Sequence, residues 1–198
     1  MGQSLAEKLC AVASFGVLSV FMPLACTAAP PPLVAVQQVP KAQAIDMEGV
    51  ENLHRVNSVL YRSGQPSAQG FTHLQAQGVR SVLNLREYHS DKKRAAHTQL
   101  QLMEHPMAAG AVTEADIEAC LRLLAGAPKP ALVHCWHGSD RTGIIVAAWR
   151  IVYEGCSVQA AEAEFRDDRY GHHEFWYGNL VELLRKIDWD AMRTRLGQ

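Results

Sequence analysis

The sequence predicts an α/β domain in which a central, mostly parallel sheet is flanked by helices. Three short apolar runs typical of buried strands occur at residues 56–61, 81–85 and 131–135, and segments with helical spacing of apolar side chains separate them. Strands that alternate with helices favour parallel pairing, because a crossover helix returns the chain to the same edge of the sheet. In such a sheet, ligands bind at the loops that follow the carboxyl ends of the strands.

Six segments between and after these strands are expected to be helical. Gly78 is placed to end the first helix, and Pro128 and Pro130 interrupt the chain just before the third strand. The expected helices cover residues 68–77, 91–103, 114–125, 142–153, 157–168 and 174–185.

The N-terminal 29 residues have the pattern of a secretory signal peptide, with an uncleaved anchor as the alternative. Lys8 precedes an almost wholly apolar or small run over residues 9–24, and small residues suited to cleavage follow. Residues 30–48 are Pro-rich and predict a linker, which leaves residues 49–198 as one domain. We therefore expect a periplasmic or secreted protein, or a membrane-tethered form of it.

Charge gives no sign of a nucleic-acid partner, because the 198 residues carry a formal net charge of only −1. The local basic run Lys92-Lys93-Arg94 is interpreted as a solvated helix start in preference to an anion-binding patch. No cysteine–histidine spacing indicates a metal site, and we expect no cofactor.

Three cysteines follow the N-terminal segment: Cys120, Cys135 and Cys156. An exported thiol enzyme is exposed to oxidation, so a reversible pairing of these cysteines is one interpretation. The favoured interpretation is that Cys120 and Cys156 are ordinary semi-buried thiols.

The segment most informative about chemistry runs from His134 to Gly143 and has the form H-C-x5-R-T-G. It places Cys135 at the end of a predicted strand and Arg141 at the start of a predicted helix. A thiolate is the nucleophilic form of cysteine, and a helix N-terminus and a nearby cation both stabilise it. Backbone amides curled over residues 136–141 can bind the oxygens of a phosphoryl group.

The other residues of this loop have predicted supporting roles. Arg141 can bind two phosphoryl oxygens at once through its planar guanidinium group, and Thr142 can hydrogen-bond the sulfur. His134 is expected to orient the loop, and Gly138 and Gly143 permit close backbone approach. The remaining predicted loop residues are Trp136, His137 and Ser139.

The H-C-x5-R-T-G pattern resembles the signature of the protein tyrosine phosphatase superfamily, and the length of the chain is similar to its dual-specificity branch. Segments 60–66, 78–86 and 169–173 resemble a bacterial periplasmic subgroup, in which His172-His173 is a loop feature. The resemblance implies a cysteine phosphatase fold and hydrolysis of phosphomonoesters through a phosphocysteine. Protein phosphotyrosine is the preferred substrate, with phosphoserine and phosphothreonine as further candidates. A similar layout in phosphatases of inositol pyrophosphates leaves an inositol polyphosphate or a phosphoinositide as the alternative.

The resemblance also implies a general acid on an upstream loop, yet the matching residues 105–113 contain no aspartate. Asp140, Asp116 and Glu114 are the candidates to replace it. Asp140 could equally hold a turn, whereas Glu114 and Asp116 follow Thr113 in the pattern of a capped helix start.

Two further questions stay open at the level of sequence. Arg62 and Arg86 each follow a strand, so either a substrate-binding rim or surface ion pairing fits them. The missing aspartate also permits a binding module that holds phosphate and turns over poorly, and a sulfur-transfer loop is disfavoured by the Arg-Thr-Gly ending. The expected partner is a phosphorylated protein or a small phosphorylated metabolite.

Overall fold

A computed structural model of the chain describes residues 40–198. The predicted signal segment, 1–29, and the first ten residues of the predicted linker lie outside the described residues. We expected the domain to begin at residue 49, but the fold includes earlier residues. Ala42 is buried, and β1 (Gln43–Ala44) pairs with β2 (His54–Arg55).

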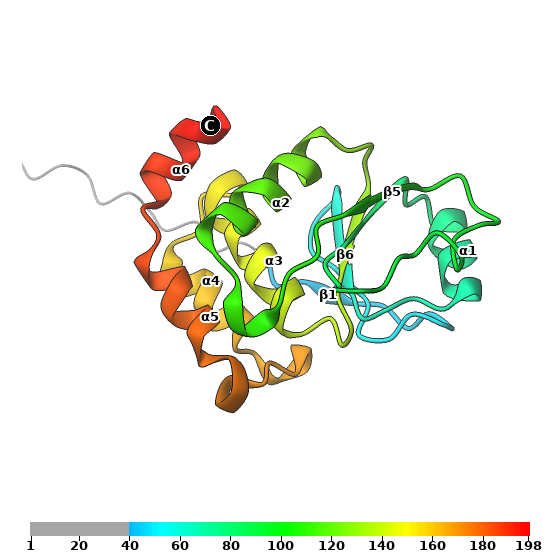
Figure 1. The fold of residues 1–198 in the computed structure, drawn as a ribbon, viewed down its shortest axis with the longest axis horizontal. Helices are drawn as coiled ribbons and strands as arrows, with labels where there is room; N and C mark the ends of the chain where they lie inside the picture. The colour runs from blue at the N-terminus through cyan, green and yellow to red at the C-terminus, as the bar shows by residue number, and fades with distance from the viewer. Residues whose placement is uncertain (1–39) are drawn as a thin grey trace, which may run out of the picture. The chain divides into compact units, whose positions relative to one another are not determined.

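The sheet has six strands in the order β1-β2-β3-β6-β4-β5 (Figure 1). Its four longer strands are parallel to one another, and the pairings β1–β2 and β2–β3 at one edge are antiparallel. The predicted α/β fold with a mostly parallel sheet is therefore confirmed. The parallel strands are β3 (Leu60–Ser63), β4 (Ser81–Asn84), β5 (Gln101–Glu104) and β6 (Ala131–His134).

Strand β6 lies between β3 and β4, and all four of its residues are buried. Because side chains alternate along a strand, its two faces enter separate cores. Leu132 packs with Phe71 and Leu74 beneath helix α1 (Ala68–Ala76), whereas Val133 joins the core on the opposite face.

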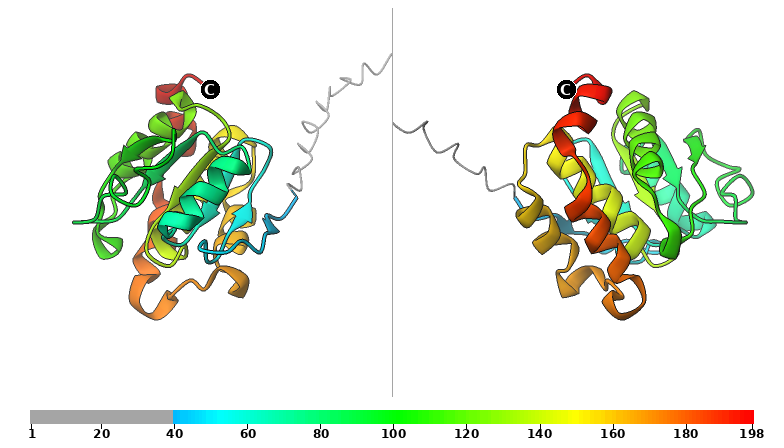
Figure 2. Two further views of the ribbon diagram at one scale, coloured as in Figure 1. Left: turned by 90° about the vertical axis from the view of Figure 1, so that its right-hand side faces the viewer. Right: turned by 60° about the vertical axis from the view of Figure 1, so that its left-hand side comes forward.

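The helices cover both faces of the sheet unequally. Helix α1 lies alone on one face, and the remaining helices gather on the other (Figures 1 and 2). The helices of the larger layer are α2 (Glu114–Gly126), α3 (Asp140–Tyr153), α4 (Val158–Phe165), α5 (Glu174–Lys186) and α6 (Trp189–Leu196), with short 3-10 turns at η1 (Ala109–Ala111) and η2 (Asp168–Tyr170).

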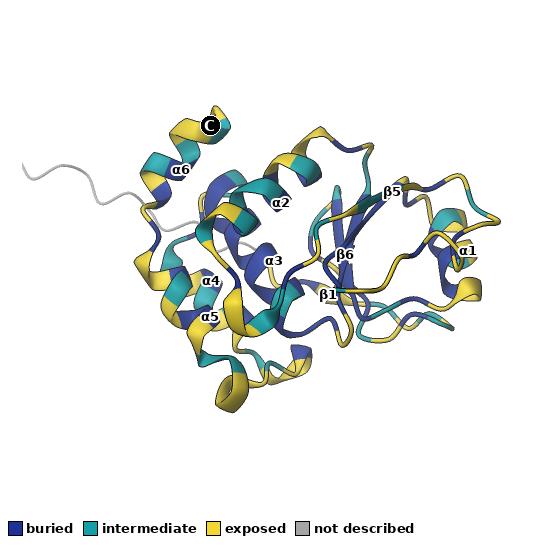
Figure 3. Cartoon of the chain, in the orientation of Figure 1, coloured by how far each residue is buried: buried dark blue, intermediate teal, exposed yellow. Residues whose placement is uncertain are grey.

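Helix α3, which starts at the predicted phosphate loop, is the central helix of the larger layer. It contacts α2, α4, α5 and α6 and is almost entirely buried (Figure 3). Gly143 permits this packing, since a Cβ there would lie 2.3 Å from Cε2 of Phe165 on α4. Among residues 40–198, no helix combines the length and apolar character needed to cross a bilayer.

The helix predicted over residues 91–103 is wrong. Residues 91–98 form successive turns, and Gln101–Glu104 is strand β5, in register with β4 so that Gln101 lies beside Ser81. The run Lys92-Lys93-Arg94 therefore lies in a turn and not at a helix start. Pairing with the sheet outweighs the local helix propensity of this segment. Strands β1 and β2 and helix α6 were not predicted.

Candidate active site

Cys135 follows β6 directly and lies at a cavity of about 360 Å³. Cys135 is almost fully buried, and the cavity reaches it. Residues from the phosphate loop, η1 and the start of α5 line the cavity around it: Ala109, Trp136, His137, Asp140, Arg141, His173, Trp176 and Tyr177.

The loop after Cys135 is shaped by three donors that bind its carbonyl groups from outside. The Gln65 amide donates to Trp136 O (2.9 Å), Asn52 Nδ2 donates to His137 O (2.9 Å), and Arg62 Nη2 donates to Gly138 O (2.8 Å). Within residues 40–198, the N–H groups of residues 136–139 donate to no protein acceptor. Those amides are consequently available to an anion, as the sequence pattern predicted.

Gly138 is the loop position that requires glycine. Its φ is +78°, and a Cβ there would lie 2.5 Å from Gly64 N and from Ser63 C. The end of β3 therefore presses directly against the loop. Gly143 permits a close approach, as predicted, and the neighbour that it admits is the Phe165 ring of α4.

Arg62 is not a rim residue. Its side chain is 1% exposed, its guanidinium carbon lies 3.9 Å from the centroid of the Tyr170 ring, and it supports Gly138. Burial lowers the pKa of Arg62 to about 10, so the group remains charged at neutral pH. The prediction of a substrate-binding role fails because β3 ends beneath the loop, where the side chain cannot reach solvent.

Arg86 is also held behind the cavity wall. It is buried, donates to Gln65 Oε1 (2.6 Å) and lies 4.1 Å from the centroid of the Trp136 ring. Trp136 itself is half exposed and lines the cavity. Arg86 therefore positions Trp136 and is no part of the cavity lining, which corrects its predicted place on the rim.

Arg141 lines the cavity, and part of its guanidinium group has no hydrogen-bond acceptor within residues 40–198. Nη1 donates to Met107 O (3.2 Å), and Nε is buried with no partner among the described residues. A buried donor without a partner costs about 1–3 kcal/mol. In the cavity, an entering anion can accept from the guanidinium group of Arg141. The hydroxyl of Thr142 is likewise buried and unpaired within residues 40–198, and the predicted hydrogen bond to the Cys135 sulfur is not formed.

His134 anchors the loop from below. Its Nε2 lies 2.7 Å from Oδ2 of Asp91, and Gln65 Nε2 donates to the other carboxylate oxygen (2.9 Å). Burial alone would raise the pKa of Asp91, but the hydrogen bonds from His134 and Gln65 bring it below its usual value. The buried carboxylate is therefore ionised and fixes the His134 ring, in agreement with the orienting role predicted for that histidine.

Asp116 and Glu114 lie outside the cavity lining. Asp116 closes a capping box with Thr113 at the start of α2 and also binds His105 (2.9 Å), while Glu114 pairs with Arg195 (2.5 Å). Burial acts to raise the pKa of Asp116, but these hydrogen bonds lower it overall. The alternative interpretation as helix-start residues is the correct one, and neither carboxylate is placed to act as the acid.

Asp140 does line the cavity, but it is bound by two histidines. Oδ1 accepts from His172 Nδ1 (2.8 Å) and from the His173 amide (2.9 Å), and Oδ2 lies 2.8 Å from His173 Nδ1. Burial would raise the pKa of Asp140, yet these hydrogen bonds lower it below the usual value. Asp140 is thus an ionised carboxylate and holds no proton to donate at neutral pH.

The other two cysteines of the described region, Cys120 and Cys156, are free and buried. Burial strongly raises the pKa of the Cys120 thiol, and burial also raises that of Cys156. No disulfide joins either of them to Cys135 in residues 40–198, which agrees with their interpretation as ordinary buried thiols.

A thiol at a strand end, loop amides without a protein acceptor in residues 40–198 and an arginine at the following helix define a cysteine-dependent phosphatase. The comparisons lead to the same class. A family model described as a DSP-PTPase phosphatase fused to NAD+ kinase matches residues 31–175. The chain therefore belongs to the dual-specificity family of protein tyrosine phosphatases, and the predicted enzyme class is confirmed.

Two relatives illustrate this membership. The dual specificity protein phosphatase TpbA of Pseudomonas aeruginosa is 34% identical over 157 residues, which is 78% of this chain and 70% of that protein. Its crystal structure superposes with a TM-score of 0.72 at 31% identity and covers 80% of this chain and 97% of its own. The PP-IP phosphatase Siw14 of Saccharomyces cerevisiae shares the fold, with a TM-score of 0.64 at 22% identity over 74% of this chain and 91% of its own.

Several residues that build the site were not predicted. Asn52, Gln65 and Asp91 act at the loop from distant segments, so no local pattern identifies them. His172 and His173 were noted only as a loop feature, although both contact Asp140. Asn52 has a φ of +53°, a left-handed conformation that asparagine adopts more readily than most residues.

Proposed function

We propose that this phosphatase hydrolyses protein phosphotyrosine. The observation that carries the proposal is the set of aromatic residues, Trp136, Trp176 and Tyr177, that line the same cavity as Cys135. Such side chains pack against a phenyl ring in stacked or edge-on geometry. A structure of the relative TpbA has been solved in complex with phosphotyrosine, which supports the same substrate class here.

In the proposed mechanism, the Cys135 thiolate attacks phosphorus and forms a phosphocysteine. The free amides of residues 136–139 and the guanidinium of Arg141 bind the non-bridging oxygens and stabilise the charge that develops on them. The substrate alcohol leaves with a proton from a general acid. Water then attacks the phosphocysteine, releases phosphate and restores the thiolate.

An inositol polyphosphate is the second substrate class that the sequence suggested. Such a substrate needs cations for several phosphates, yet among the described residues that line the cavity Arg141 is the one lysine or arginine. Arg62 and Arg86, the basic residues expected to serve it, are engaged behind the loop. This observation favours phosphotyrosine.

The proposal is tested by steady-state hydrolysis with the purified protein under reducing conditions and with a chelator. An aryl phosphate, a phosphotyrosine peptide and an inositol polyphosphate are compared, with Cys135→Ser as control. We expect the peptide to have the highest kcat/KM and Cys135→Ser to lose turnover. A preference for the inositol polyphosphate would reject the substrate assignment. Phosphate binding with no turnover on any substrate would indicate the binding module.

We further propose export of the protein through its N-terminal segment. The support is the sequence pattern of residues 1–29, with Lys8 before an apolar run and small residues at its end. Cell fractionation followed by N-terminal sequencing of the natural protein tests it. Recovery of a shortened chain outside the cytoplasm is expected, an intact chain in the membrane fraction would indicate an anchor, and an intact cytoplasmic chain would reject export.

A further inference from the structure

The site described above contains no protonated carboxylic acid, although the reaction needs a proton donor. The η1 segment contributes Ala109 to the cavity lining, and its methyl side chain has no proton to give. The carboxyl of Asp140 is ionised, because its pKa is lowered. Among the described lining residues other than Cys135 and Arg141, His137, His173 and Tyr177 can donate a proton. Of these, His173 alone contacts a carboxylate.

Asp140 fixes His173 twice. The His173 amide donates to Oδ1 (2.9 Å), and the ring nitrogen Nδ1 lies 2.8 Å from Oδ2. These two hydrogen bonds hold the backbone and the ring of His173 against the first turn of α3. They leave the ring little freedom to rotate. His173 also starts α5, where its carbonyl accepts the amides of Trp176 and Tyr177.

The hydrogen-bond pattern assigns the tautomers. A carboxylate only accepts, so His172 and His173 each carry a proton on Nδ1. Nε2 of His172 is buried with no partner in the described part of the chain, and the ring is 3% exposed against Phe165 (centroids 4.3 Å apart). A second proton on that ring would bury an unpaired charged donor, which is costly. His172 does not line the cavity and therefore serves as a support for Asp140.

His173 differs from His172 in exposure. Its side chain is 42% exposed and lines the cavity that contains Cys135 and Arg141. With Nδ1 bound to Asp140, Nε2 is the nitrogen left for the cavity, and it has no protein partner within residues 40–198. The Asp140 carboxylate balances the positive charge that a proton on Nε2 creates.

We propose that His173 is the general acid of this phosphatase, held in position and charge-balanced by Asp140, and that this pair replaces the aspartate missing from residues 105–113. The inference rests on the proposed phosphatase mechanism and adds to it the identity of the proton donor.

The proton balance closes over the two steps. In the first step the Cys135 thiolate bonds to phosphorus, the phosphorus–oxygen bond breaks, and the leaving oxygen takes the Nε2 proton, which leaves His173 neutral. In the second step neutral His173 accepts a proton from water as its oxygen bonds to phosphorus and the phosphorus–sulfur bond breaks. The thiolate and the imidazolium are both restored, and hydrogen phosphate leaves.

The groups that face His173 come from three segments. Asp140 lies on α3, and His172 directly precedes His173 in the chain. His137 lies on the phosphate loop with its ring centroid 5.3 Å away, and Cys135, Arg141 and Tyr177 share the cavity. Asp140 is the one carboxylate among them.

The test uses His173→Asn, because the asparagine amide can replace the Nδ1 contact to Asp140 but cannot supply the Nε2 proton. We compare kcat/KM for a series of aryl phosphates that runs from good to poor leaving groups, since good leaving groups depart without acid assistance. For the poorest leaving group we expect a fall of about 10²- to 10⁴-fold, with a much smaller fall for the best. The basic limb of the kcat/KM pH profile should disappear.

Three companion variants make the result decisive. His97→Asn, at an exposed turn away from the cavity, should leave the whole series unchanged. Asp140→Asn should show part of the effect expected for His173→Asn, a larger loss of kcat/KM for poor leaving groups, because it removes the charge that balances protonated His173. Equal losses for every leaving group in His173→Asn, or an unchanged series, would overturn the inference, as would transfer of the effect to Asp116→Asn.

Failure of the acid assignment is separable from failure of the phosphatase mechanism. If Cys135→Ser keeps wild-type turnover, the mechanism itself is rejected, whatever His173 does. If Cys135→Ser is inactive while His173→Asn shows no leaving-group dependence, the mechanism stands and the acid assignment falls. Thermal melting and binding of inorganic phosphate to His173→Asn confirm that the variant is folded with an intact loop.

Discussion

The Asp91 carboxylate lies 2.7 Å from Nε2 of His134, the residue directly before the nucleophile, and both side chains are buried. The same carboxylate accepts from Gln65, which in turn binds Arg86 and, through its amide, the carbonyl of Trp136. One buried charge therefore orders the strand end and the cavity wall together.

Asp91→Ala should lower both stability and catalytic efficiency. It leaves the buried Nε2 of His134 without its partner, which costs about 1–3 kcal/mol, and it removes one of the two acceptors of Gln65 Nε2. Urea unfolding and kcat/KM for an aryl phosphate measure the two effects. Asp190→Ala is the matched control, since Asp190 is 94% exposed and its pair with Arg193 lies on the surface; equal losses in the two variants would contradict the assignment.

Arg62→Lys should weaken phosphate binding although it keeps the charge. A lysine has no planar group to stack on Tyr170 while it binds the Gly138 carbonyl. We expect a higher inhibition constant for inorganic phosphate and a loss of about 1–3 kcal/mol of stability. Arg55→Lys, at an exposed position of β2, should change neither quantity, and an unaltered inhibition constant in Arg62→Lys would show that the loop does not depend on this contact.

Gly143→Ala should destabilise the fold because the new Cβ meets Phe165. Overpacking of this kind costs about 1–3 kcal/mol, and a smaller residue at 165 should restore part of it. Gly178→Ala is the matched helical control, because nothing lies within 4 Å of a Cβ there. It should be neutral or stabilise by up to about 1 kcal/mol. Chemical denaturation of the two variants and of Gly143→Ala with Phe165→Leu provides the comparison.

Asp116→Ala should lower the stability of the fold and leave the dependence of kcat/KM on the leaving group unchanged. Loss of a helix cap costs about 1 kcal/mol, and Thr113→Ala, which removes the other half of the capping box, should cost a similar amount. Thermal melts and the aryl phosphate series measure the two properties on the same samples. If kcat/KM of Asp116→Ala depended more steeply on the leaving group than kcat/KM of the wild type does, Asp116 would be the general acid.

Stability should fall in acid as Asp140 is protonated. The pKa of this carboxyl is lowered in the folded state, so its contribution is complete above the unfolded value of about 3.9. The contribution is lost as the pH falls through the lower, folded-state pKa. Urea unfolding below about pH 5 should therefore show the gap between wild type and Asp140→Asn closing as the pH decreases. A gap that stays constant would mean that Asp140 does not titrate as described.

The parts of the fold that could be predicted are those encoded locally. The apolar run at residues 131–135, the loop glycine at 138 and the arginine at 141 lie in one short segment, so the nucleophile, the cradle and the following helix could all be inferred. Ser67 and Thr113 cap helices α1 and α2 through contacts only three residues away. Such short-range interactions leave a readable pattern.

What could not be predicted depends on contacts between distant segments. Residues 91–103 contain good helix formers, yet Asp91 binds His134 and residues 101–104 pair with β4. Arg62 has the same sequence context whether it faces solvent or the loop, and only the position of β3 beside β6 decides. The link between Asp140 and His173 spans 33 residues, so no spacing rule identifies it.

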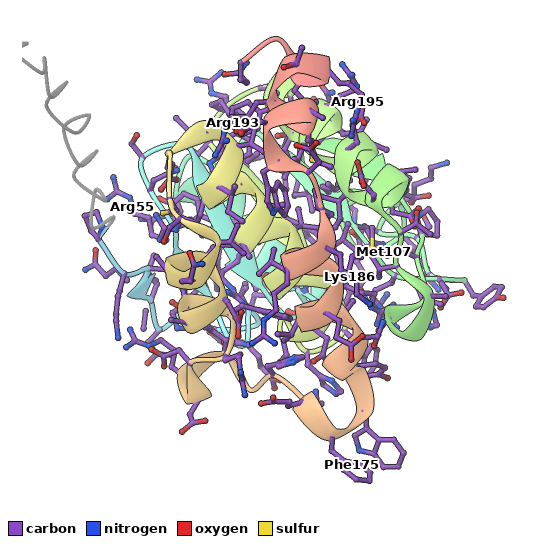
Figure 4. The ribbon with its side chains drawn as sticks, turned by 90° about the vertical axis from the view of Figure 1, so that its left-hand side faces the viewer. Arg55, Met107, Phe175, Lys186, Arg193 and Arg195 are labelled. Carbon is purple, nitrogen blue, oxygen red and sulfur yellow. The ribbon has the colours of Figure 1, made fainter. Side chains whose placement is uncertain are left out.

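The tryptophans divide into two optical populations. Trp136 and Trp176 line the cavity and are exposed, whereas Trp149 and Trp189 are buried in the core. Phe175 projects from the start of α5 (Figure 4), and its ring centroid lies 5.1 Å from that of Trp176. Emission from the solvated pair should respond to ligand binding and that from the core pair to unfolding. A single unlabelled sample therefore offers separate fluorescence signals for occupancy of the cavity and integrity of the domain.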